Sequence, residues 1–587
     1  MPHRYRLPAL WLFFWGFHAV AHAVDPAADS GWIDQSNRHA QALLEADARY
    51  GPEGVASLGL EQYDTGIIDL KPRNSERAEA DLAAVAATLE AARGAESDER
   101  VKQDLAILVQ AARDEHDTSV LNRRLMIPYF DLGRMLFGSF NAQLDPRVSK
   151  QRHAAALVRL RRYAGNERGY EPITTLARAR IEERMNDASL TWPWVTEVEQ
   201  HLADAKGYVD GTRELLQKSG LKGWQKDFDV LASQLKAHND WVRTTVLPKA
   251  RKSNRLPPEI YANNLKSYGV DADPHQLMQR AQFAFMQTRD EMDALARSIA
   301  AQKGSGPSDY RSLIRDLKKN QIAPDHLLDT YKGRLTQVED IIRREHIVTL
   351  PKRDAMIRLG TEAESAASPA PYMNPPRLIG NTGEPAIFVL VTGSRNPKGG
   401  VFDDFGYDAI SWALTTHEAR PGHELQFSGM IEHGVTTARA VYAFNSANVE
   451  GWGLYSEAIM KQYLPPEGQL GALQLRLMRT ARAFLDPMLN LGLIEPAAAR
   501  RILTEQVMLS EAFAKSEVDR YTFGSPGQAT AYFYGYSRLE ALRARTELAL
   551  GDKFDQQHFH DFIIGEGLLP LDLLDQAVAT RFVPTQH

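Results

Sequence analysis

A short segment near residue 420 combines side chains that can bind a metal ion. His417, Glu418 and His423 lie within seven residues, and Glu450 follows 27 residues after His423. Catalytic zinc sites use three protein ligands, commonly imidazole nitrogens and a carboxylate oxygen, and leave the fourth position to water. Zinc lowers the pKa of that water to about 7, and a neighbouring glutamate can pass its proton to a leaving amine. The segment therefore predicts hydrolytic metal chemistry.

The spacing of the two histidines differs from the common H-E-x-x-H pattern. In that pattern the histidines lie about 40° apart around a helix, so both reach one metal ion. His417 and His423 are six residues apart, and a regular helix would separate them by about 240°. Pro421 breaks a helix and Gly422 accepts unusual dihedral angles. We therefore predict a broken or bulged helix at Ala419–Gly422 that brings His423 back beside His417.

Most of the chain around this segment is predicted to be helical. Apolar residues recur every three to four positions over 75–93, 97–121 and 276–299, where good helix formers dominate. The helical pattern returns at about Asp408, just before the histidines, and continues to the end of the chain. The predicted fold class is mainly α, a large helical fold with a small β element before the active-site helix.

The best strand candidate lies in a proline- and glycine-rich stretch from about 350 to 406. Residues Ala386–Thr392 form a short apolar, β-branched run bounded by turn residues. Because these residues are apolar on both faces, a buried strand is the first interpretation. The second is an exposed edge strand that pairs with an extended peptide substrate beside the segment from His417 to Glu450, called the metal segment below.

The first residues have the pattern of a secretory signal peptide. Arg4 and Arg6 precede the apolar block Ala9–Phe17, which is too short to span a bilayer, and an A-x-A site ends at Ala23. We expect cleavage after Ala23 and a secreted protein, with the periplasm as its destination. An uncleaved N-terminal helix is the alternative.

Composition excludes several classes of protein. The 587 residues are 43% hydrophobic and 25% charged, with a net charge of −6, so neither a disordered chain nor a basic nucleic-acid-binding surface is indicated. The absence of cysteine excludes disulfides, thiolate nucleophiles and cysteine-bound zinc. No stable membrane insertion is expected once the signal peptide is removed. After residues 1–23, the predicted division is a helical N-terminal lobe at 24–345 and a catalytic lobe at 346–587.

The metal segment and several later motifs resemble a known bacterial family. The resemblance rests on the residues His417-Glu418-x-x-Pro421-Gly422-His423, Glu450-Gly451-Trp452-x-x-Tyr455-x-Glu457, Tyr372-x-Asn374-Pro375-Pro376, Arg520-Tyr521, Pro526-Gly527-Gln528-Ala529-x-x-Tyr532-x-x-Gly535 and Phe559-His560-Asp561. The family is the domain-of-unknown-function family number eight-eight-five of the gluzincin metallopeptidase clan. It is distantly similar to thimet-oligopeptidase-like and angiotensin-converting-enzyme-like peptidases, which implies a single, largely helical, metallopeptidase-like fold.

The same resemblance implies roles for individual residues. His417, His423 and Glu450 would bind one Zn²⁺ ion, and Glu418 would be the general base. Tyr532 would stabilise the oxyanion, with its neighbour Tyr534 close by. Both tyrosines could equally be core residues of an amphipathic helix.

Other residues have two interpretations each. Glu457 lies seven residues after Glu450, on the same helical face, and is expected to hydrogen-bond a ligand rather than bind the metal. Arg520 and Arg543 can hold a substrate carboxylate or pair with helix carboxylates. His433 is expected in a loop but is the substitute ligand if Glu450 fails. Structural roles are expected for His558 and His560.

We expect a secreted zinc-dependent peptidase that hydrolyses oligopeptides with Glu418 as general base. The alternatives are a hydrolase of another amide, such as a cell-wall peptide or an amino-acid conjugate, and a catalytically inactive helical binding protein. The expected partner is a peptide substrate, with no nucleic acid. The sequence indicates no oligomeric state.

Overall fold

Helices form most of the computed structural model, which describes residues 31–361, 364–365, 368, 370–381, 383–391 and 402–586. The predicted signal peptide at 1–23 lies outside these residues. The predicted mainly α fold is confirmed. Within the described residues, no helix is both long and apolar enough to cross a membrane.

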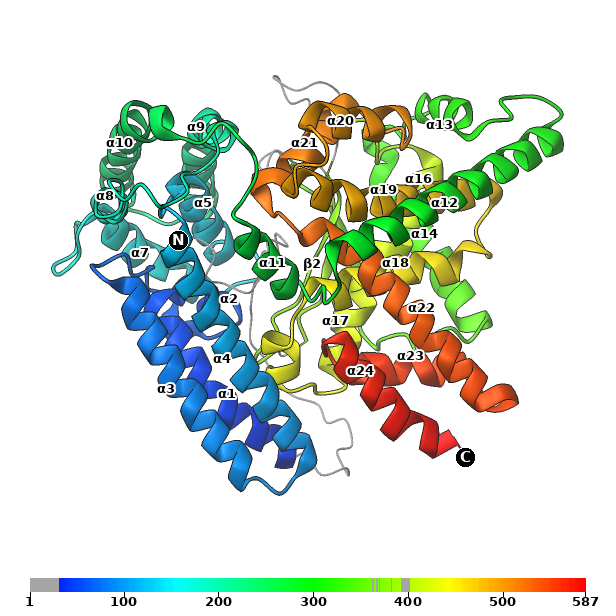
Figure 1. The fold of residues 1–587 in the computed structure, drawn as a ribbon, viewed down its shortest axis with the longest axis horizontal. Coiled ribbons are helices and arrows are strands. Elements are labelled where there is room, and N and C mark those ends of the chain that lie inside the picture. The colour runs from blue at the N-terminus through cyan, green and yellow to red at the C-terminus, as the bar shows by residue number, and fades with distance from the viewer. Residues whose placement is uncertain are drawn as a thin grey trace.

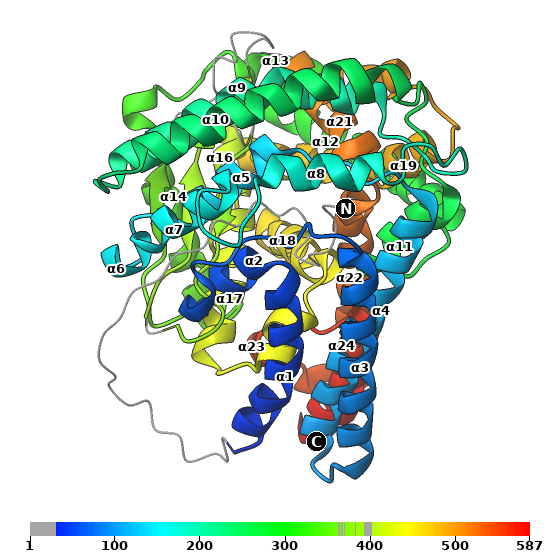
Figure 2. The same cartoon turned by 90° about the vertical axis from the view of Figure 1, so that its left-hand side faces the viewer.

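The N-terminal helices gather on one side of the molecule, at the left of Figure 1. Figure 2 shows α1, α3 and α4 standing upright together, with α5–α10 above them. These helices are α1 (Gly31–Tyr50), α2 (Pro52–Ser57), α3 (Asn74–Ala95), α4 (Glu99–Leu125), α5 (Leu132–Gln143), α6 (Lys150–His153), α7 (Ala155–Ala164), α8 (Ile173–Glu182), α9 (Val195–Lys218) and α10 (Gln225–Trp241).

Four further helices lead from this group to the β element. They are α11 (Pro258–Ser267), α12 (Pro274–Lys303), α13 (Tyr310–Lys318) and α14 (Pro324–Arg344). The predicted helix at 276–299 corresponds to α12. Asp273 caps its first turn by accepting a hydrogen bond from the backbone N–H of Gln276, and Gly304 ends it with φ +67°. The sequence thus carries both a start signal and a stop signal for this helix.

The C-terminal helices enclose the metal segment and lie at the right of Figure 1. They are α16 (Asp408–Leu414), α17 (His423–Glu432), α18 (Ser446–Lys461), α19 (Pro466–Asn490), α20 (Pro496–Glu505), α21 (Glu511–Asp519), α22 (Ala531–Leu550), α23 (Gln556–Gly565) and α24 (Leu571–Ala577). Short turns of π- or 3₁₀-helix join them, including η4 (Thr415–Ala419), η5 (Ala438–Tyr442), η6 (Arg520–Gly524) and η7 (Gln528–Thr530).

A small sheet of three strands lies before the metal segment. Its strands are β1 (Met356–Leu359), β2 (Tyr372–Asn374) and β3 (Ile387–Leu390). The central strand β3 pairs in parallel with β1 and antiparallel with β2, and all four of its residues are buried. The buried-strand interpretation of this run is therefore confirmed for Ile387–Leu390. The edge-strand interpretation is wrong, because both edges of β3 are already paired.

The largest hydrophobic core joins helices that are far apart in the chain. It includes Leu43 of α1, Leu105 of α4, Phe285 of α12, Phe484 of α19 and Phe559 of α23. This core therefore joins α1–α4 to the helices that carry the metal segment, whereas α5 and α7–α10 contribute to two smaller cores. The division into lobes at residue 345 stays a prediction.

Candidate metal centre

The two histidines meet because the helix that carries them is interrupted, as predicted from Pro421. Helix α16 widens into the π-turn η4, Arg420 takes an extended conformation, and α17 starts at His423. Gly422 lets the chain fold back on itself, since a Cβ atom there would lie 1.8 Å from the carbonyl oxygen of His417. The two imidazole rings lie 4.6 Å apart between centroids. The predicted break at Ala419–Gly422 is confirmed.

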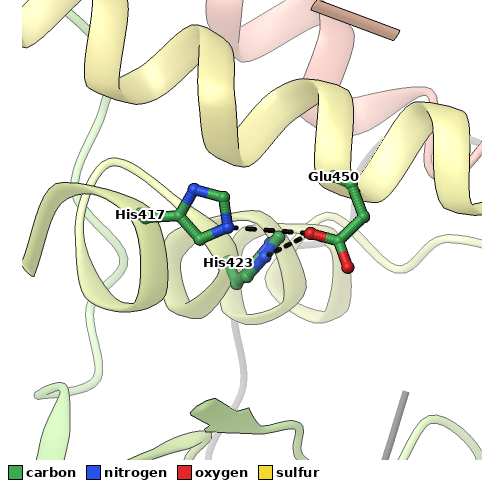
Figure 3. A group of neighbouring side chains, drawn as sticks. All are labelled: His417, His423 and Glu450. Atoms are coloured by element: carbon green, nitrogen blue, oxygen red, sulfur yellow. Dashed lines mark ion pairs between the residues drawn. The ribbon is translucent and has the colours of Figure 1, made fainter. Parts of the chain in front are cut away.

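Glu450 reaches the two histidines from a different helix. Asn445 caps α18 by accepting a hydrogen bond from the N–H of Asn448, which starts the helix one turn before Glu450. Figure 3 shows the carboxylate pointing from α18 toward both rings. One oxygen, Oε2, lies 3.6 Å from Nε2 of His417 and 3.5 Å from Nε2 of His423. All three residues are at most 3% exposed.

These distances fit a metal ion. Two ligands held 2.0–2.2 Å from one tetrahedral ion lie about 3.3–3.6 Å apart. The donors are two imidazole nitrogens and one carboxylate oxygen, which is the ligand set of a catalytic site with an open fourth position. Across the described ranges, no other group of three such side chains brings its ligand atoms within 4.8 Å of one another. These three residues, called the metal cluster below, can therefore hold a metal ion.

A second carboxylate, that of Glu457, contacts the other ring nitrogen of His417. Oε1 of Glu457 lies 2.7 Å from Nδ1 of His417, and Arg479 lies 3.5 Å from the same oxygen. Burial lowers the pKa of His417, but the carboxylates of Glu450 and Glu457 outweigh it and raise that pKa to about 9. Burial also raises the pKa of Glu450, but the two histidines outweigh it and hold that pKa well below its usual range. The site thus attracts positive charge strongly, which a cation can supply in place of the protons.

Glu418 lies between the metal cluster and the sheet. Its Oε2 accepts a hydrogen bond of 2.9 Å from the backbone N–H of Met373 on β2. Burial raises the pKa of Glu418, and the nearby His417 and His423 partly oppose that rise. Unlike the three cluster residues, Glu418 is partly exposed. It is thus placed to exchange a proton with a molecule that reaches the site.

Tyr532 packs against the ring of His417. Its ring stacks on the His417 ring at 6.4 Å between centroids, and its hydroxyl accepts a hydrogen bond of 3.1 Å from Arg520. Tyr534, two residues later, lies about 200° around the helix. Its hydroxyl donates to the carbonyl of Asp271 and accepts from Arg538, so the structure does not bring it to the metal cluster.

Comparison with known proteins places the chain in a family. Residues 52–578 match the family described as "Bacterial protein of unknown function (DUF885)". The chain belongs to DUF885. No curated protein matches the sequence.

Two solved structures share the fold of this DUF885 chain. A "putative lipoprotein" from Colwellia psychrerythraea is 20% identical, with a TM-score of 0.74, over 95% of this chain and 99% of that one. A "putative lipoprotein of unknown function" from Shewanella oneidensis is 19% identical, with a TM-score of 0.71, over 94% of this chain and 100% of that one. A "putative oligoendopeptidase F" from Bacillus anthracis str. Ames is 9% identical with a TM-score of 0.26, which is too low to indicate a shared fold.

Other polar contacts in the DUF885 chain fix the interrupted helix, and the sequence analysis missed them. Nε1 of Trp452 on α18 donates a hydrogen bond of 2.9 Å to the carbonyl of Pro421. Arg420 is buried and pairs with Glu424 at 2.6 Å and with Glu339 of α14 at 2.6 Å. The spacing of Arg420 and Glu424, four residues apart, was the available signal. The contact of Trp452 was not predictable, because it depends on how α18 crosses the turn.

Two other histidines that the sequence analysis considered, His433 and His560, are not part of the cluster. Nδ1 of His433 lies 2.8 Å from the carbonyl of Gly429 in the last turn of α17, and the structure does not bring this residue to the other two histidines as a substitute ligand. His560 is buried between the hydroxyl of Tyr455 and the carbonyl of Ile347, in agreement with the structural role expected for it.

Proposed function

We propose that this protein is a zinc-dependent peptidase that hydrolyses peptide bonds of oligopeptides. The observation that carries the proposal is the convergence of three buried donor atoms, Nε2 of His417, Nε2 of His423 and Oε2 of Glu450, from two separate helices. Burial of three such groups without a partner ion is costly, because each must be compensated in a low-dielectric interior. In this proposal one Zn²⁺ ion is held by these three residues.

The bound ion would supply Lewis acidity toward a substrate carbonyl and lower the pKa of a water molecule to about 7. Glu418 has the features of the general base. Its pKa is raised by burial, and Met373 engages one oxygen, Oε2. The other oxygen, Oε1, is the one that would take the proton of the attacking water and deliver it to the leaving amine.

Tyr532 has the features of the oxyanion donor. Burial raises its pKa, although Arg520 opposes this, so the hydroxyl keeps its proton at neutral pH. Arg520 and the stacking on His417 fix the orientation of the phenol. A donor held in place before the reaction stabilises developing negative charge without reorganisation.

Glu457 and Arg479 would position His417 rather than contact the substrate. A carboxylate at Nδ1 fixes the ring so that Nε2 faces the metal. Arg479 in turn keeps the Glu457 carboxylate in place. The gluzincin resemblance agrees with this assignment, and the break at Pro421 explains how the longer H-E-x(4)-H spacing still forms one site.

The proposal is tested by metal analysis together with Glu418→Gln. We expect one zinc per chain in the wild-type protein and in the variant. Hydrolysis of a panel of peptides, cell-wall peptides and amino-acid conjugates should occur in the wild type only and stop with a chelator. Glu505→Gln, exposed on α20, is the matched control and should hydrolyse normally. Full zinc occupancy without hydrolysis of any amide would instead indicate a binding protein.

We also propose that the protein acts outside the cytoplasm. The sequence pattern of residues 1–23 and the lipoprotein descriptions of its structural relatives support this location. The chain has no cysteine that could carry a lipid, so this proposal is for a released protein. The N-terminal sequence of the exported protein should begin at Val24. A start at Met1 would contradict it.

A further inference from the structure

Three arginines surround the ring of Tyr532. The Cζ atoms of Arg479, Arg482 and Arg520 lie 5.6, 4.6 and 5.4 Å from its centroid. Arg479 and Arg482 come from α19, and Arg520 begins η6. Because the ring stacks on His417, this positive group lies beside the metal cluster, on the Tyr532 side.

The charges of two of the arginines are matched by carboxylates. Arg482 makes a bidentate pair with Glu517, at 2.6 and 2.8 Å, and both side chains are almost fully buried. Arg479 lies 3.5 Å from Glu457. These two arginines therefore have structural partners.

Arg520 differs from its two neighbours. Its one carboxylate contact among the described residues is Glu517 at 3.4 Å, and Arg482 already holds that carboxylate. Its other hydrogen bonds go to two neutral groups, the side-chain oxygen of Gln528 and the hydroxyl of Tyr532. The Arg520 side chain is also 24% exposed, whereas Glu517 is 4% exposed.

The more distant carboxylate of Asp486 interacts with Arg520 electrostatically, but that carboxylate accepts its hydrogen bonds from other groups, among them Tyr261 and the N–H of Gly527. Arg520 is thus the least closely paired of the three arginines and the most exposed.

We infer that Arg520 binds a carboxylate of the substrate, close to the bond that is cleaved. The inference rests on the proposed peptidase function and specifies its substrate class. Arginine suits this task because its planar guanidinium can form two parallel hydrogen bonds with a carboxylate. The position beside Tyr532 places the carboxylate near the scissile carbonyl, which Tyr532 is proposed to contact.

Two sources of such a carboxylate are possible in a peptide. One is the free C-terminus, which would make the protein an exopeptidase that removes C-terminal residues. The other is an aspartate or glutamate side chain next to the scissile bond. Consecutive Cα atoms are 3.8 Å apart, so both carboxylates reach a similar distance from the scissile carbonyl. The experiment must therefore separate them.

Binding to the zinc-loaded Glu418→Gln protein tests the inference without turnover. The probes are acetyl-trialanine as the free acid, its C-terminal amide, and the amide of acetyl-Ala-Glu-Ala, measured by calorimetric titration. A charged hydrogen-bonded pair predicts that one carboxylate probe binds about 10- to 100-fold more tightly than the plain amide. Preference for the free acid indicates C-terminal recognition, and preference for the glutamate amide indicates side-chain recognition.

Variants of Arg520 in the Glu418→Gln protein then show whether Arg520 causes the carboxylate preference. Arg520→Gln should remove the preference, and Arg520→Lys should keep part of it, with zinc content unchanged in both. Arg543→Gln is the matched control, because Arg543 is also 24% exposed but pairs with Glu547 on its own helix. That variant should keep the preference. Equal binding of all three probes, or a preference that survives Arg520→Gln, would overturn the inference.

Failure of the inference and failure of the proposed function look different. If the wild-type protein cleaves acid and amide peptides equally well and binds them equally, the peptidase proposal stands and the role of Arg520 falls. If the carboxylate preference is present but no peptide is cleaved, the carboxylate site stands and the peptidase proposal falls.

Discussion

Individual side chains around Tyr532 have separable roles. The hydroxyl of Tyr532 accepts a hydrogen bond from Arg520 and its ring stacks on His417, but Tyr532 is not one of the three clustered donors. Replacing it should therefore affect the transition state and leave the metal in place. This separation distinguishes an oxyanion donor from a residue that only packs against His417.

Tyr532→Phe is predicted to lower kcat about 100- to 1000-fold, because one preorganised oxyanion donor is lost. KM and zinc content should stay close to the wild-type values. The measurement is steady-state peptide hydrolysis with zinc determined on the same samples. Tyr534→Phe is the control, since its hydroxyl contacts Asp271 and Arg538 instead, and it should keep its kcat. Normal kcat in Tyr532→Phe would remove this residue from the mechanism.

The sequence was sufficient to select the three clustered residues but not their surroundings. Residue types and the Pro421-Gly422 break pointed to His417 and His423, and the family resemblance added Glu450, which the structure places beside them. Arg479 and the N–H of Met373 were not predicted, because no sequence pattern indicates how α19 and β2 pack against the cluster. Contacts of that kind depend on tertiary packing, which local patterns do not encode.

At the scale of elements, the position of Glu450 depends on how closely α18 approaches α22. The two helices cross at Gly451 and Gly535, where their backbones touch. A Cβ atom at Gly535 would lie 1.8 Å from the carbonyl oxygen of Ala447. Because that atom belongs to the backbone of α18, no side-chain movement can relieve the overlap.

Gly535→Ala is predicted to destabilise the protein by about 1–3 kcal/mol or more and to lower zinc occupancy, because α18 carries Glu450. Thermal unfolding and zinc content measure the two effects. Gly333→Ala on α14 is the matched control, since nothing lies within 4 Å of a Cβ atom there. It should be neutral or slightly stabilising, as alanine favours a helix over glycine. Equal behaviour of the two variants would contradict the close crossing.

A buried ion pair joins α19 to α21 and gives the fold a defined response to acid. Burial raises the pKa of Glu517, but Arg482 and Arg520 outweigh it and hold that pKa at about 2. A carboxyl group whose pKa is lower in the folded state stabilises the fold above its unfolded pKa. That stabilisation is lost as the pH falls from about 4.5 through 2.

The wild-type free energy of unfolding should therefore fall by roughly 3 kcal/mol more between pH 5 and pH 2 than that of Glu517→Gln. At pH 7 the variant should be less stable, by about 3–5 kcal/mol, because Arg482 loses its partner. Urea unfolding at a series of pH values measures both quantities. Glu505→Gln, on the exposed face of α20, should keep the wild-type slope. A Glu517→Gln protein with that same slope would show that the pair does not govern acid stability.

The sequence predicted the long helices better than the π-turn and the small sheet. Helices such as α12 were predictable because their apolar period and end signals agree. The π-turn at Thr415–Ala419 was foreseen only as an irregularity, since Pro421 and Gly422 indicate a break but not its form. Whether the run at Ile387–Leu390 lies at the centre or the edge of its sheet depended on β1 and β2, which the sequence indicates only weakly because they are short.

At the scale of the whole molecule, a buried polar network fastens the N-terminal helices to the C-terminal ones. Asp104 of α4 is fully buried and accepts hydrogen bonds from Ser36 of α1 and Thr436, both at 2.6 Å. It also pairs at 2.8 Å with Arg439 of η5, which contacts Glu566 after α23. Together with the shared hydrophobic core, this network predicts that α1–α4 and the C-terminal helices unfold together.

Asp104→Asn tests this prediction. The amide cannot replace a carboxylate that accepts from three donors, so we expect a loss of about 3–5 kcal/mol and, for a chain of this size, a fall in Tm of about 3–4 °C. The fall should appear as one transition, seen equally in calorimetry and in limited proteolysis of N-terminal and C-terminal segments. Asp240→Asn, whose partners Lys236 and Arg243 are exposed neighbours on the same stretch of helix, should leave Tm nearly unchanged. If Asp104→Asn splits the unfolding into two transitions, with only the N-terminal helices melting early, those helices are an independent unit, and the metal helices do not need them to stay folded.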